Sequence, residues 1–250
     1  MRKIIAIPDI QAPKHDPTAV STAIKIIKGE KPDEVIHIGD FIAFDSISRF
    51  KKRDWKEARQ TAAEEIEAAN QILDQFDKAI NGKTKVVFLE GNHERRLEAF
   101  MIQHAQALGE GFRGLSIQEQ LHLDERGYEY IPTNKQPYVV GELGFIHGWY
   151  VNLYHAAKHV RQGGRNLIYG HTHDHQVYTG AHLDHQEPRI CMSIGCLCDF
   201  RQAYLESRPS NWIHGVALIY IDEATGFFWP NFVPIINGVA VVNGKQYHSA

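Results

Sequence analysis

The segment KVVFLEGNHERR, residues 85–96, contains both local patterns on which the fold depends. Its first part, Lys85 to Leu89, is a short run of mostly apolar residues, which is typical of a strand buried on both faces. Its second part, Gly91-Asn92-His93-Glu94, is a polar turn directly after that run. Glycine lets such a turn be tight and brings the backbone close to whatever is bound there.

The same pattern, an apolar run that ends in polar residues, recurs along the chain. The runs are Lys3–Pro8, Glu34–Ile38, Lys85–Leu89, Leu143–Ile146, Asn166–Tyr169, Arg189–Ile194, Val216–Ile221 and Phe227–Val233. The first five are followed by Asp9-Ile10-Gln11, Gly39-Asp40, Gly91-Asn92-His93-Glu94, His147-Gly148 and Gly170-His171-Thr172-His173. Ligand sites of open α/β sheets assemble at the carboxyl ends of the strands, so this order predicts one site built from all five turns.

Segments with helical periodicity lie between the early strands. Between Trp55 and Ile80 the apolar residues form a single stripe, which predicts one amphipathic helix that ends at Asn81-Gly82. A second helix is predicted over 94–108. The second half of the chain is rich in strands, which indicates sheets flanked by helices. We find no repeat or break in composition, so we expect one domain over 1–250, with a lid-like insertion at about 98–141.

Composition excludes several classes of protein. The 27 Lys and Arg residues against 30 Asp and Glu give a net charge of −3, unlike a strongly basic nucleic-acid scaffold or an acidic disordered tail. No apolar stretch approaches the roughly 20 residues of a membrane span, and we expect a cytoplasmic protein without a membrane partner. Cys191, Cys196 and Cys198 are expected to be buried and reduced, since no second thiolate pair completes a soft-metal site.

From Asp9 to His173, the order of these motifs resembles that of the calcineurin-like metallophosphoesterases. This superfamily comprises binuclear-metal phosphatases, phosphodiesterases and DNA-break-repair nucleases. The sequences Ser46-Ile47-Ser48-Arg49-Phe50, after Gly39-Asp40, and Gly91-Asn92-His93-Glu94-Arg95-Arg96 look like those of compact members from bacteriophage genomes. The resemblance implies an α/β fold, namely a four-layer α/β/β/α sandwich of two mixed sheets flanked by helices.

The resemblance also implies two divalent metal ions, which we expect to be Mn, with Fe, Zn, Ni and Co as alternatives, because oxygen and imidazole ligands without thiolate suit these ions. Asp40 would be the catalytic bridging carboxylate. The remaining ligands would be Asp9, Gln11 and His173 for the first ion and Asn92, His147 and His171 for the second.

Four residues are expected to contact the phosphate. By resemblance, the catalytic His93 lies outside the metal sphere and stabilises or protonates the leaving oxygen, and Asn92 lies beside it. Arg95 and Arg96 would clamp the phosphate, with solvated surface residues as the equally weighted alternative.

Two positions depart from the family pattern. Gln11 stands where a His is usual, which predicts a more labile first site that prefers Mn²⁺, unless His15 replaces it. Ala43 stands where a second carboxylate usually supports the catalytic histidine. Either the nearby Asp45 replaces it or His93 works unassisted. These departures predict retuned rather than lost catalysis.

The function implied is hydrolysis of phosphate esters by a hydroxide that bridges the two ions. The substrate stays open between a monoester, a diester, a nucleotide and single-stranded nucleic acid, and the 98–141 segment is expected to decide it. One alternative is a DNA-processing nuclease that leads a strand over a basic cluster with Phe50 and Trp55 interleaved. That cluster is Arg49, Lys51, Lys52, Arg53, Lys56 and Arg59.

The other alternative is a non-catalytic binding protein in which Gln11 and Ala43 mark lost activity. Other histidines, His175, His182 and His185, are expected at the surface or behind the ligands. Trp149, Tyr150 and Tyr154 are expected either to line the mouth of the site or to pack in the core. The sequence leaves the oligomeric state open.

Overall fold

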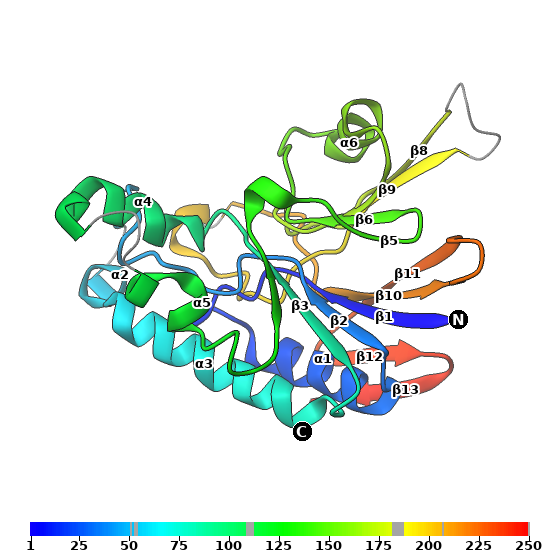
Figure 1. Cartoon of the computed structure of the whole chain (residues 1–250), viewed down its shortest axis with the longest axis horizontal. Coiled ribbons are helices and arrows are strands. Elements are labelled where there is room, and N and C mark those ends of the chain that lie inside the picture. Colours follow the sequence, from blue (N-terminus) through cyan, green and yellow to red (C-terminus); the bar gives the residue numbers. More distant parts are fainter. Residues whose placement is uncertain (51, 53–54, 109–112, 182–187, 207, 250) are drawn as a thin grey trace.

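Two mixed sheets pack face to face in the computed structural model, which describes residues 1–50, 52, 55–108, 113–181, 188–206 and 208–249 (Figure 1). The order of strands in the first sheet is β11 (Phe228–Pro234), β10 (Gly215–Ile221), β1 (Arg2–Ile7), β2 (Glu34–His37), β3 (Lys85–Leu89) and β4 (Glu129–Ile131). The order in the second is β5 (Tyr138–Val140), β6 (Leu143–Ile146), β7 (Asn166–Tyr169), β9 (Arg189–Ser193) and β8 (Val177–Gly180). Strands β1 to β4 are mutually parallel, as are β6, β7 and β9, whereas β10, β11, β5 and β8 pair antiparallel.

Helices cover both outer faces, which confirms the four-layer α/β/β/α sandwich (Figure 1). Helices α1 (Pro17–Glu30) and α3 (Ala62–Ala79) pack on the first sheet, and α6 (His155–Gly163) packs on the second. The hairpin of β12 (Val239–Val242) and β13 (Lys245–His248) contributes to the α1 side of the core. The remaining helices are α2 (Trp55–Arg59), α4 (Arg95–His104) and α5 (Ile117–Gln120), with 3-10 turns at Gln106–Leu108, Arg113–Leu115, Thr133–Lys135 and Ala203–Leu205.

Both faces of the central strands are buried, which explains why their sequences are apolar throughout. On β1, Ile5 and Ile7 face the helices α1 and α3, whereas Ile4 and Ala6 face the second sheet. Phe145 of β6 meets them from that sheet. Burying such side chains stabilises the fold by about 1.5–3 kcal/mol each, so this core fixes the two sheets against each other.

The helix predicted from Trp55 to Ile80 is in fact two helices, α2 and α3. Thr61 ends the continuity because its side chain accepts from the backbone N–H of Glu64, whose carboxylate accepts from the backbone N–H of Thr61. This capping box starts a new helix. The apolar stripe of α3 is confirmed, since Leu73 and Phe76 are fully buried against the first sheet. The helix predicted over 94–108 ends earlier, at His104.

The segment predicted as an insertion, 98–141, contributes to both sheets. Its strands β4 and β5 extend one edge of each sheet, and α5 packs through Ile117 into the core beneath the first. Residues 109–112 of this segment lie outside the described residues. A lid-like role of the segment stays a prediction.

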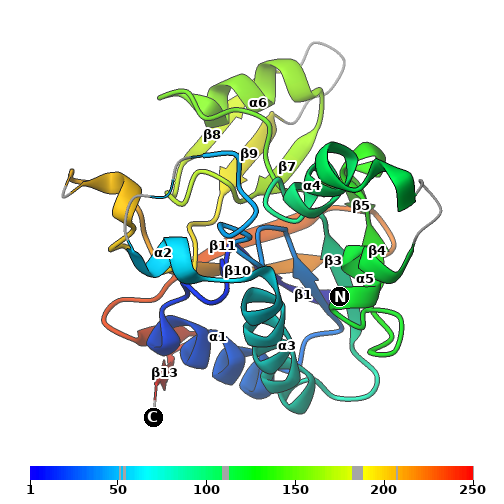
Figure 2. The same ribbon diagram turned by 90° about the vertical axis from the view of Figure 1, so that its left-hand side faces the viewer.

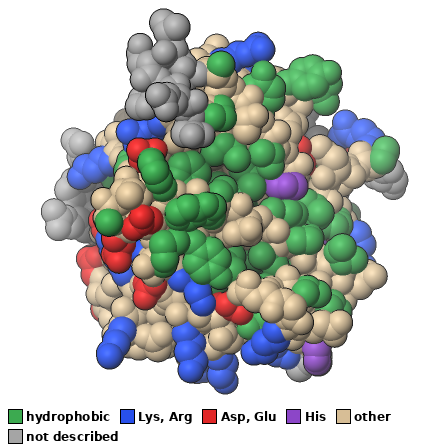
Figure 3. All heavy atoms as spheres, turned by 90° about the vertical axis from the view of Figure 1, so that its right-hand side faces the viewer, with side chains coloured by type: hydrophobic (Ala, Val, Ile, Leu, Met, Phe, Trp, Pro, Cys, Tyr) green, Lys and Arg blue, Asp and Glu red, His purple; other side chains and the backbone are tan. Residues whose placement is uncertain are grey.

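Hydrophobic side chains gather at the end of the molecule that Figure 3 shows. Exposed apolar residues on strands that reach this end include Val139 of β5, Tyr178 of β8 and Trp229 of β11. The carboxyl ends of β1, β2 and β3 lie at the opposite end (Figure 1). Among the described residues, no helix combines the length and the apolar character that crossing a bilayer requires.

Candidate metal centre

The five polar turns predicted to form one site all lie at the carboxyl ends of strands, on the edge of the sandwich that Figure 2 faces. Helices α2 and α4 lie on either side of this edge (Figure 2). The first sheet contributes the turns after β1, β2 and β3, which hold Asp9, Gln11, Asp40 and Asn92. The second sheet contributes the turns after β6 and β7, which hold His147, His171 and His173.

His147 is the centre of the first group of side chains. Its Nε2 lies 2.9 Å from Asn92 Oδ1, 3.0 Å from His171 Nδ1 and 3.2 Å from Asp40 Oδ2. Its Nδ1 lies 3.0 Å from the carbonyl oxygen of Ile38, which can only accept, so this nitrogen carries the hydrogen. In the neutral ring, Nε2 then offers a lone pair, as Asn92 Oδ1 and Asp40 Oδ2 do. Converging donors of this kind fit a bound cation, and the Ile38 bond orients the imidazole for it.

Electrostatics in this group favour positive charge. Burial acts to lower the pKa of His147, but the Asp40 carboxylate, helped by Asp9 and Glu94, outweighs burial and raises that pKa to about 10. Burial acts to raise the pKa of Asp40, yet His147 and His93 hold it below its usual range. The side chain of Asp40 is therefore ionised and almost fully buried, a state that requires a nearby cation.

The second group consists of Asp9, Gln11 and His173. His173 Nε2 lies 3.3 Å from Asp9 Oδ1 and 3.2 Å from Gln11 Nε2. Rotating the Gln11 side-chain amide by half a turn would exchange its nitrogen and oxygen. The oxygen, which is the atom able to bind a metal, would then face His173 Nε2. Burial acts to lower the pKa of His173, but Cys196 and Asp9 raise it to about 9. The three residues assigned to the first metal are thus brought together.

His15, the proposed substitute for Gln11, is held differently. Its backbone pairs with that of Cys198, and its buried Nδ1 has no hydrogen-bond partner among the residues that the structure describes. None of the described contacts of the His15 side chain joins it to Asp9, Gln11 or His173. The geometry therefore favours Gln11 over His15 as the third member of this group.

Backbone contacts join the two groups. The N–H of Gln11 donates to the carbonyl oxygen of Asp40 at 2.9 Å, and the N–H of His171 donates to the Asp9 carboxylate at 2.9 Å. A Cβ at Gly91 would collide with the backbone nitrogen of Asp40, and a Cβ at Gly170 would collide with the Asp9 carboxylate. Only glycine allows the turns to approach this closely.

Glu94 holds two of these turns together, a role that the sequence analysis missed. Its buried carboxylate accepts from the backbone N–H groups of Asp40 at 2.9 Å, Phe41 at 2.8 Å, Ile42 at 3.1 Å and Gly91 at 2.8 Å. Burial and the nearby Asp40 carboxylate raise the pKa of Glu94 to about 7. The sequence signal was an acidic residue after Gly91-Asn92-His93, but its partners are known only from the fold.

His93 lies beside Asp40, with its Nε2 3.6 Å from Asp40 Oδ2 and its backbone N–H donating to Asp40 Oδ1 at 2.8 Å. The same Nε2 accepts a hydrogen bond from Arg96 at 2.8 Å, so the hydrogen of the ring is on Nδ1. Burial lowers the pKa of His93 to about 4, and Arg96 acts in the same direction against Asp40. The ring is therefore neutral at neutral pH.

Arg96 connects His93 to Asp45. Its guanidinium donates to Asp45 Oδ1 at 2.7 Å and to the carbonyl oxygen of Ala43 at 2.7 Å, in addition to His93. Asp45 also pairs with Lys14 at 2.6 Å. The carboxylate that Ala43 lacks is thus supplied by Asp45, acting through Arg96. Arg95 is exposed at the start of α4, and the roles of both arginines toward a phosphate stay predictions.

Of the three histidines predicted at the surface or behind the ligands, His175 is exposed. His175 Nδ1 lies 2.8 Å from the carbonyl oxygen of Ser193, and its ring stacks on Phe232. His182 and His185 lie outside the described residues.

Aromatic residues are exposed after β6 and around α2. Trp149 and Tyr154 are largely exposed rather than packed in the core, and Trp149 stacks on His159 of α6. Arg49 lies over the ring of Phe50, and Arg59 lies over that of Trp55. Of the basic cluster, Lys51 and Arg53 lie outside the described residues.

The chain is similar to known proteins in family, sequence and fold. The family model described as Calcineurin-like phosphoesterase matches residues 2–188. The Gene 54 protein of Mycobacterium phage L5 is 28% identical over 255 residues, covering 98% of this chain and 98% of that protein, and the Gene 54 protein of Mycobacterium phage D29 is similar to the same extent. The crystal structure of Chaetomium thermophilum Vps29 superimposes with a TM-score of 0.49 at 10% identity, covering 100% of both chains.

Proposed function

Since this chain belongs to the calcineurin-like phosphoesterase family, we propose that it hydrolyses phosphate esters at the metal centre on the carboxyl edge of its strands. The observation that carries this proposal is the convergence of Asn92 Oδ1, His171 Nδ1 and Asp40 Oδ2 on Nε2 of His147. Among the described residues, no further side chain neutralises this set of donors. In the metal-free protein, a proton on His147 does so.

Two divalent cations are the groups that these residues fit. Asp9, Gln11 and His173 would hold one, Asn92, His147 and His171 would hold the other, and Asp40 would bridge them. Bound there, the cations would polarise the phosphoryl group and supply a nucleophile from water at neutral pH. Carboxylate, amide and imidazole ligands favour Mn²⁺ among the candidate ions, and the neutral Gln11 strengthens that preference.

His93 acts on the leaving oxygen. Its Nε2 accepts from Arg96, whereas its buried Nδ1 has no hydrogen-bond partner among the described residues. A substrate oxygen that reaches this Nδ1–H would accept a hydrogen bond from it, and the bond would stabilise the charge that develops as the ester bond breaks. Arg96 and Asp45 position the ring, and Asn92 contacts the phosphate beside it.

The segment 98–141 selects the substrate. A cavity of about 750 Å³ lies between α4, α5 and the turn after β4, and Arg95, Met101, Ile117 and Tyr130 are among its lining residues. Glu94 and Arg95, which directly follow the site residues Asn92 and His93, line the same cavity. A group attached to the phosphate would enter this mixed polar and apolar space.

Single-stranded nucleic acid is the second candidate substrate. Phe50 and Trp55 are 65% and 78% exposed, and an arginine lies over each ring. Exposed aromatic rings beside cations stack bases while the arginines contact the backbone. The formal charge of −3 limits this candidate to a local contact rather than a broad basic groove.

The test is a substrate panel with Mn²⁺ that compares p-nitrophenyl phosphate, bis-p-nitrophenyl phosphate and labelled single-stranded DNA. We expect Mn²⁺-dependent hydrolysis of at least one ester and its loss in Asp40→Asn, together with loss of bound metal. Asp222→Asn, in the turn between β10 and β11, is the matched control and should retain activity. Metal content well below two equivalents and no Mn²⁺-dependent turnover would instead indicate a non-catalytic binding protein.

The choice between ester and nucleic acid follows from the same panel. If single-stranded DNA is the substrate, Trp55→Ala should reduce its cleavage while leaving bis-p-nitrophenyl phosphate hydrolysis unchanged. Gln11→His should tighten the first metal and broaden the choice of ion. Unchanged metal content and activity would show that Gln11 is not a ligand.

A further inference from the structure

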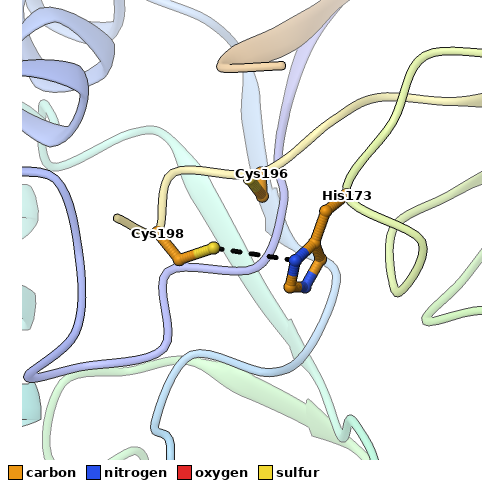
Figure 4. Close-up of side chains that lie close together, drawn as sticks. All are labelled: His173, Cys196 and Cys198. Carbon is orange, nitrogen blue, oxygen red and sulfur yellow. Dashed lines mark hydrogen bonds between the residues drawn. The ribbon is translucent and has the colours of Figure 1, made fainter. Parts of the chain in front are cut away.

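Two buried thiols lie on the far side of the His173 ring from Asp9. Cys198 Sγ lies 3.7 Å from His173 Nδ1, and the ligand atoms of Cys196, Cys198 and His173 all lie within 4.8 Å of one another. Figure 4 shows the Cys198 sulfur directed at the ring, with Cys196 on the same loop. The proposed hydrolysis uses neither thiol.

We propose that Cys196, Cys198 and Nδ1 of His173 form a binding site for one thiophilic divalent cation of the Zn²⁺ or Cd²⁺ class. This site is distinct from the metal centre, because Nδ1 faces the thiols while Nε2 faces Asp9 and Gln11. From the sequence, Cys196-x-Cys198 was expected to bind no soft metal, because a second thiolate pair is lacking, but the fold supplies an imidazole instead. Two cysteines and one histidine are a known ligand set for zinc.

The spacing of the three ligand atoms suits such an ion. Tetrahedral zinc with bonds of about 2.3 Å to sulfur and about 2.0 Å to nitrogen keeps its ligand atoms roughly 3.5–3.8 Å apart. The observed 3.7 Å between Cys198 Sγ and His173 Nδ1 agrees with this value. The separations that involve Cys196 are at most 4.8 Å, so an ion between the three atoms would draw this side chain closer by rotation.

The loop that carries the thiols is held firmly in place. The N–H of Cys196 donates to the carbonyl oxygen of Ile213 at 3.0 Å, and the N–H of Leu197 donates to that of Asp9 at 2.8 Å. Nε2 of His214 lies 2.9 Å from the carbonyl oxygen of Cys198. Because the backbone is fixed on both sides, the ligands lose little conformational freedom on binding.

Charge balance also favours a divalent cation. Cys196 and Cys198 are completely buried and His173 is 4% exposed. When the cation binds, each thiol loses its proton to water, and the two thiolates neutralise the two positive charges while His173 keeps its single hydrogen on Nε2. When the first metal also takes Nε2, the ring loses that hydrogen too and joins the two sites as an imidazolate. A buried site with no net charge avoids the large desolvation cost of an isolated ion.

Cadmium is the probe, because its bonds to thiolate give an ultraviolet charge-transfer band that oxygen and nitrogen ligands do not give. Purified, fully reduced protein is titrated with CdCl₂, and bound cadmium is counted after gel filtration. We expect one thiolate-bound cadmium in the native protein. Cys196→Ser and Cys198→Ser should each weaken the retention of cadmium by at least about 100-fold. This is the upper end of the loss seen when only a residue that hydrogen-bonds a ligand is removed.

Cys191→Ser is the matched control. Cys191 is equally buried, but its sulfur lies against the carbonyl oxygen of Arg165 beneath α6 and is not among the three ligand atoms. The band should persist in Cys191→Ser. It should also persist in Asp40→Asn, so failure of the proposed hydrolysis and failure of this site are separate results. Circular dichroism checks that each variant is folded.

Two results would overturn the proposal. One is a folded native protein that binds cadmium without the thiolate band. The other is a band that survives when Cys196 and Cys198 are both serine.

Discussion

Arg96 is the residue whose role differs most from its expected role. Its planar guanidinium bonds His93, Asp45 and the carbonyl oxygen of Ala43 at once, which the single ammonium of lysine does not do. We expect Arg96→Lys to lower kcat for bis-p-nitrophenyl phosphate by about tenfold, as loss of an outer-sphere partner does, with KM almost unchanged. Arg96→Ala should lower kcat further.

Steady-state kinetics distinguish this positioning role from a phosphate clamp. Loss of a clamp that binds ground state and transition state equally would raise KM and leave kcat unchanged. Partial recovery of kcat in Arg96→Lys relative to Arg96→Ala would support positioning. A large rise in KM in both variants would contradict it.

His147 and His173 make the stability of the metal-free protein depend on pH. The pKa values of about 10 and about 9 in the folded protein lie above the ordinary value of 6.5. The folded state therefore keeps protons that the unfolded state has lost, and this stabilisation is complete below pH 6.5 and disappears as the pH rises through 9 and 10.

In urea unfolding with a chelator present, we expect the free energy of unfolding to fall by about 1 kcal/mol or more between pH 6.5 and pH 10. The measurement should be repeated with His147→Asn, in which the fall should be smaller. A stability that rises over this window in the native protein would rule out the proposed proton binding.

The meeting of the five polar turns at one edge was predictable from the sequence, because each turn follows an apolar run directly. Their assignment as metal ligands came from the family resemblance and stays a prediction. The partners that support these residues were not predictable. Glu94 accepts from the N–H of Asp40, a residue 54 positions earlier, and Asp45 reaches His93 through Arg96. Nothing in a sequence shows which distant group a charged side chain will meet, so such contacts appear only in the fold.

At the scale of elements, long strands and helices were easier to predict than short ones. The runs at β1, β2 and β3 were visible because both faces are apolar. The three-residue strands β4 and β5 were missed because pairing with β3 and β6, rather than periodicity, makes them strands. The break between α2 and α3 could have been found, since Thr61 and Glu64 have the spacing of a capping box.

The turn after β3 gives a direct test of close packing between elements. A Cβ at Gly91 would collide with the backbone nitrogen and the carboxylate of Asp40, and neither can move without disturbing the metal centre. We expect Gly91→Ala to cost about 1–3 kcal/mol of stability and to reduce hydrolysis below a tenth of the native rate.

Gly82→Ala is the matched control, because no atom of the described part of the chain lies within 4 Å of a Cβ built there. This change should leave hydrolysis unaltered and alter stability by less than about 1 kcal/mol. The two variants are compared by thermal unfolding and by initial rates with Mn²⁺. Equal effects at both positions would show that the contact at Gly91 is unimportant.

At the scale of the whole molecule, the core between the sheets predicts that the chain unfolds as one unit. Phe145 is fully buried in that core, and we expect Phe145→Ala to cost about 3–5 kcal/mol. Val139→Ala, at a residue 43% exposed on β5, should cost far less. Unfolding followed by circular dichroism and by tryptophan fluorescence should give the same midpoint, and separate midpoints would contradict a single domain.

Strand patterns indicated two sheets and flanking helices, and the family resemblance supplied the number of layers. The order of strands in each sheet was not predictable, because β10 returns to pair beside β1 from more than two hundred residues away. That pairing depends on which apolar faces fit together in three dimensions, a property that no local stretch contains.

Because the candidate ligands come from both sheets, cations held among them would link the two sheets along one edge of the sandwich. The buried hydrophobic layer holds the sheets together across their width. At that edge, the carboxylates of the metal-free protein are neutralised by protons on His147 and His173, and they repel one another once the pH rises through 9 and 10. Removing the ions would then allow the two sheets to separate at this edge. Hydrolysis and the contact between the sheets at this edge would be lost together.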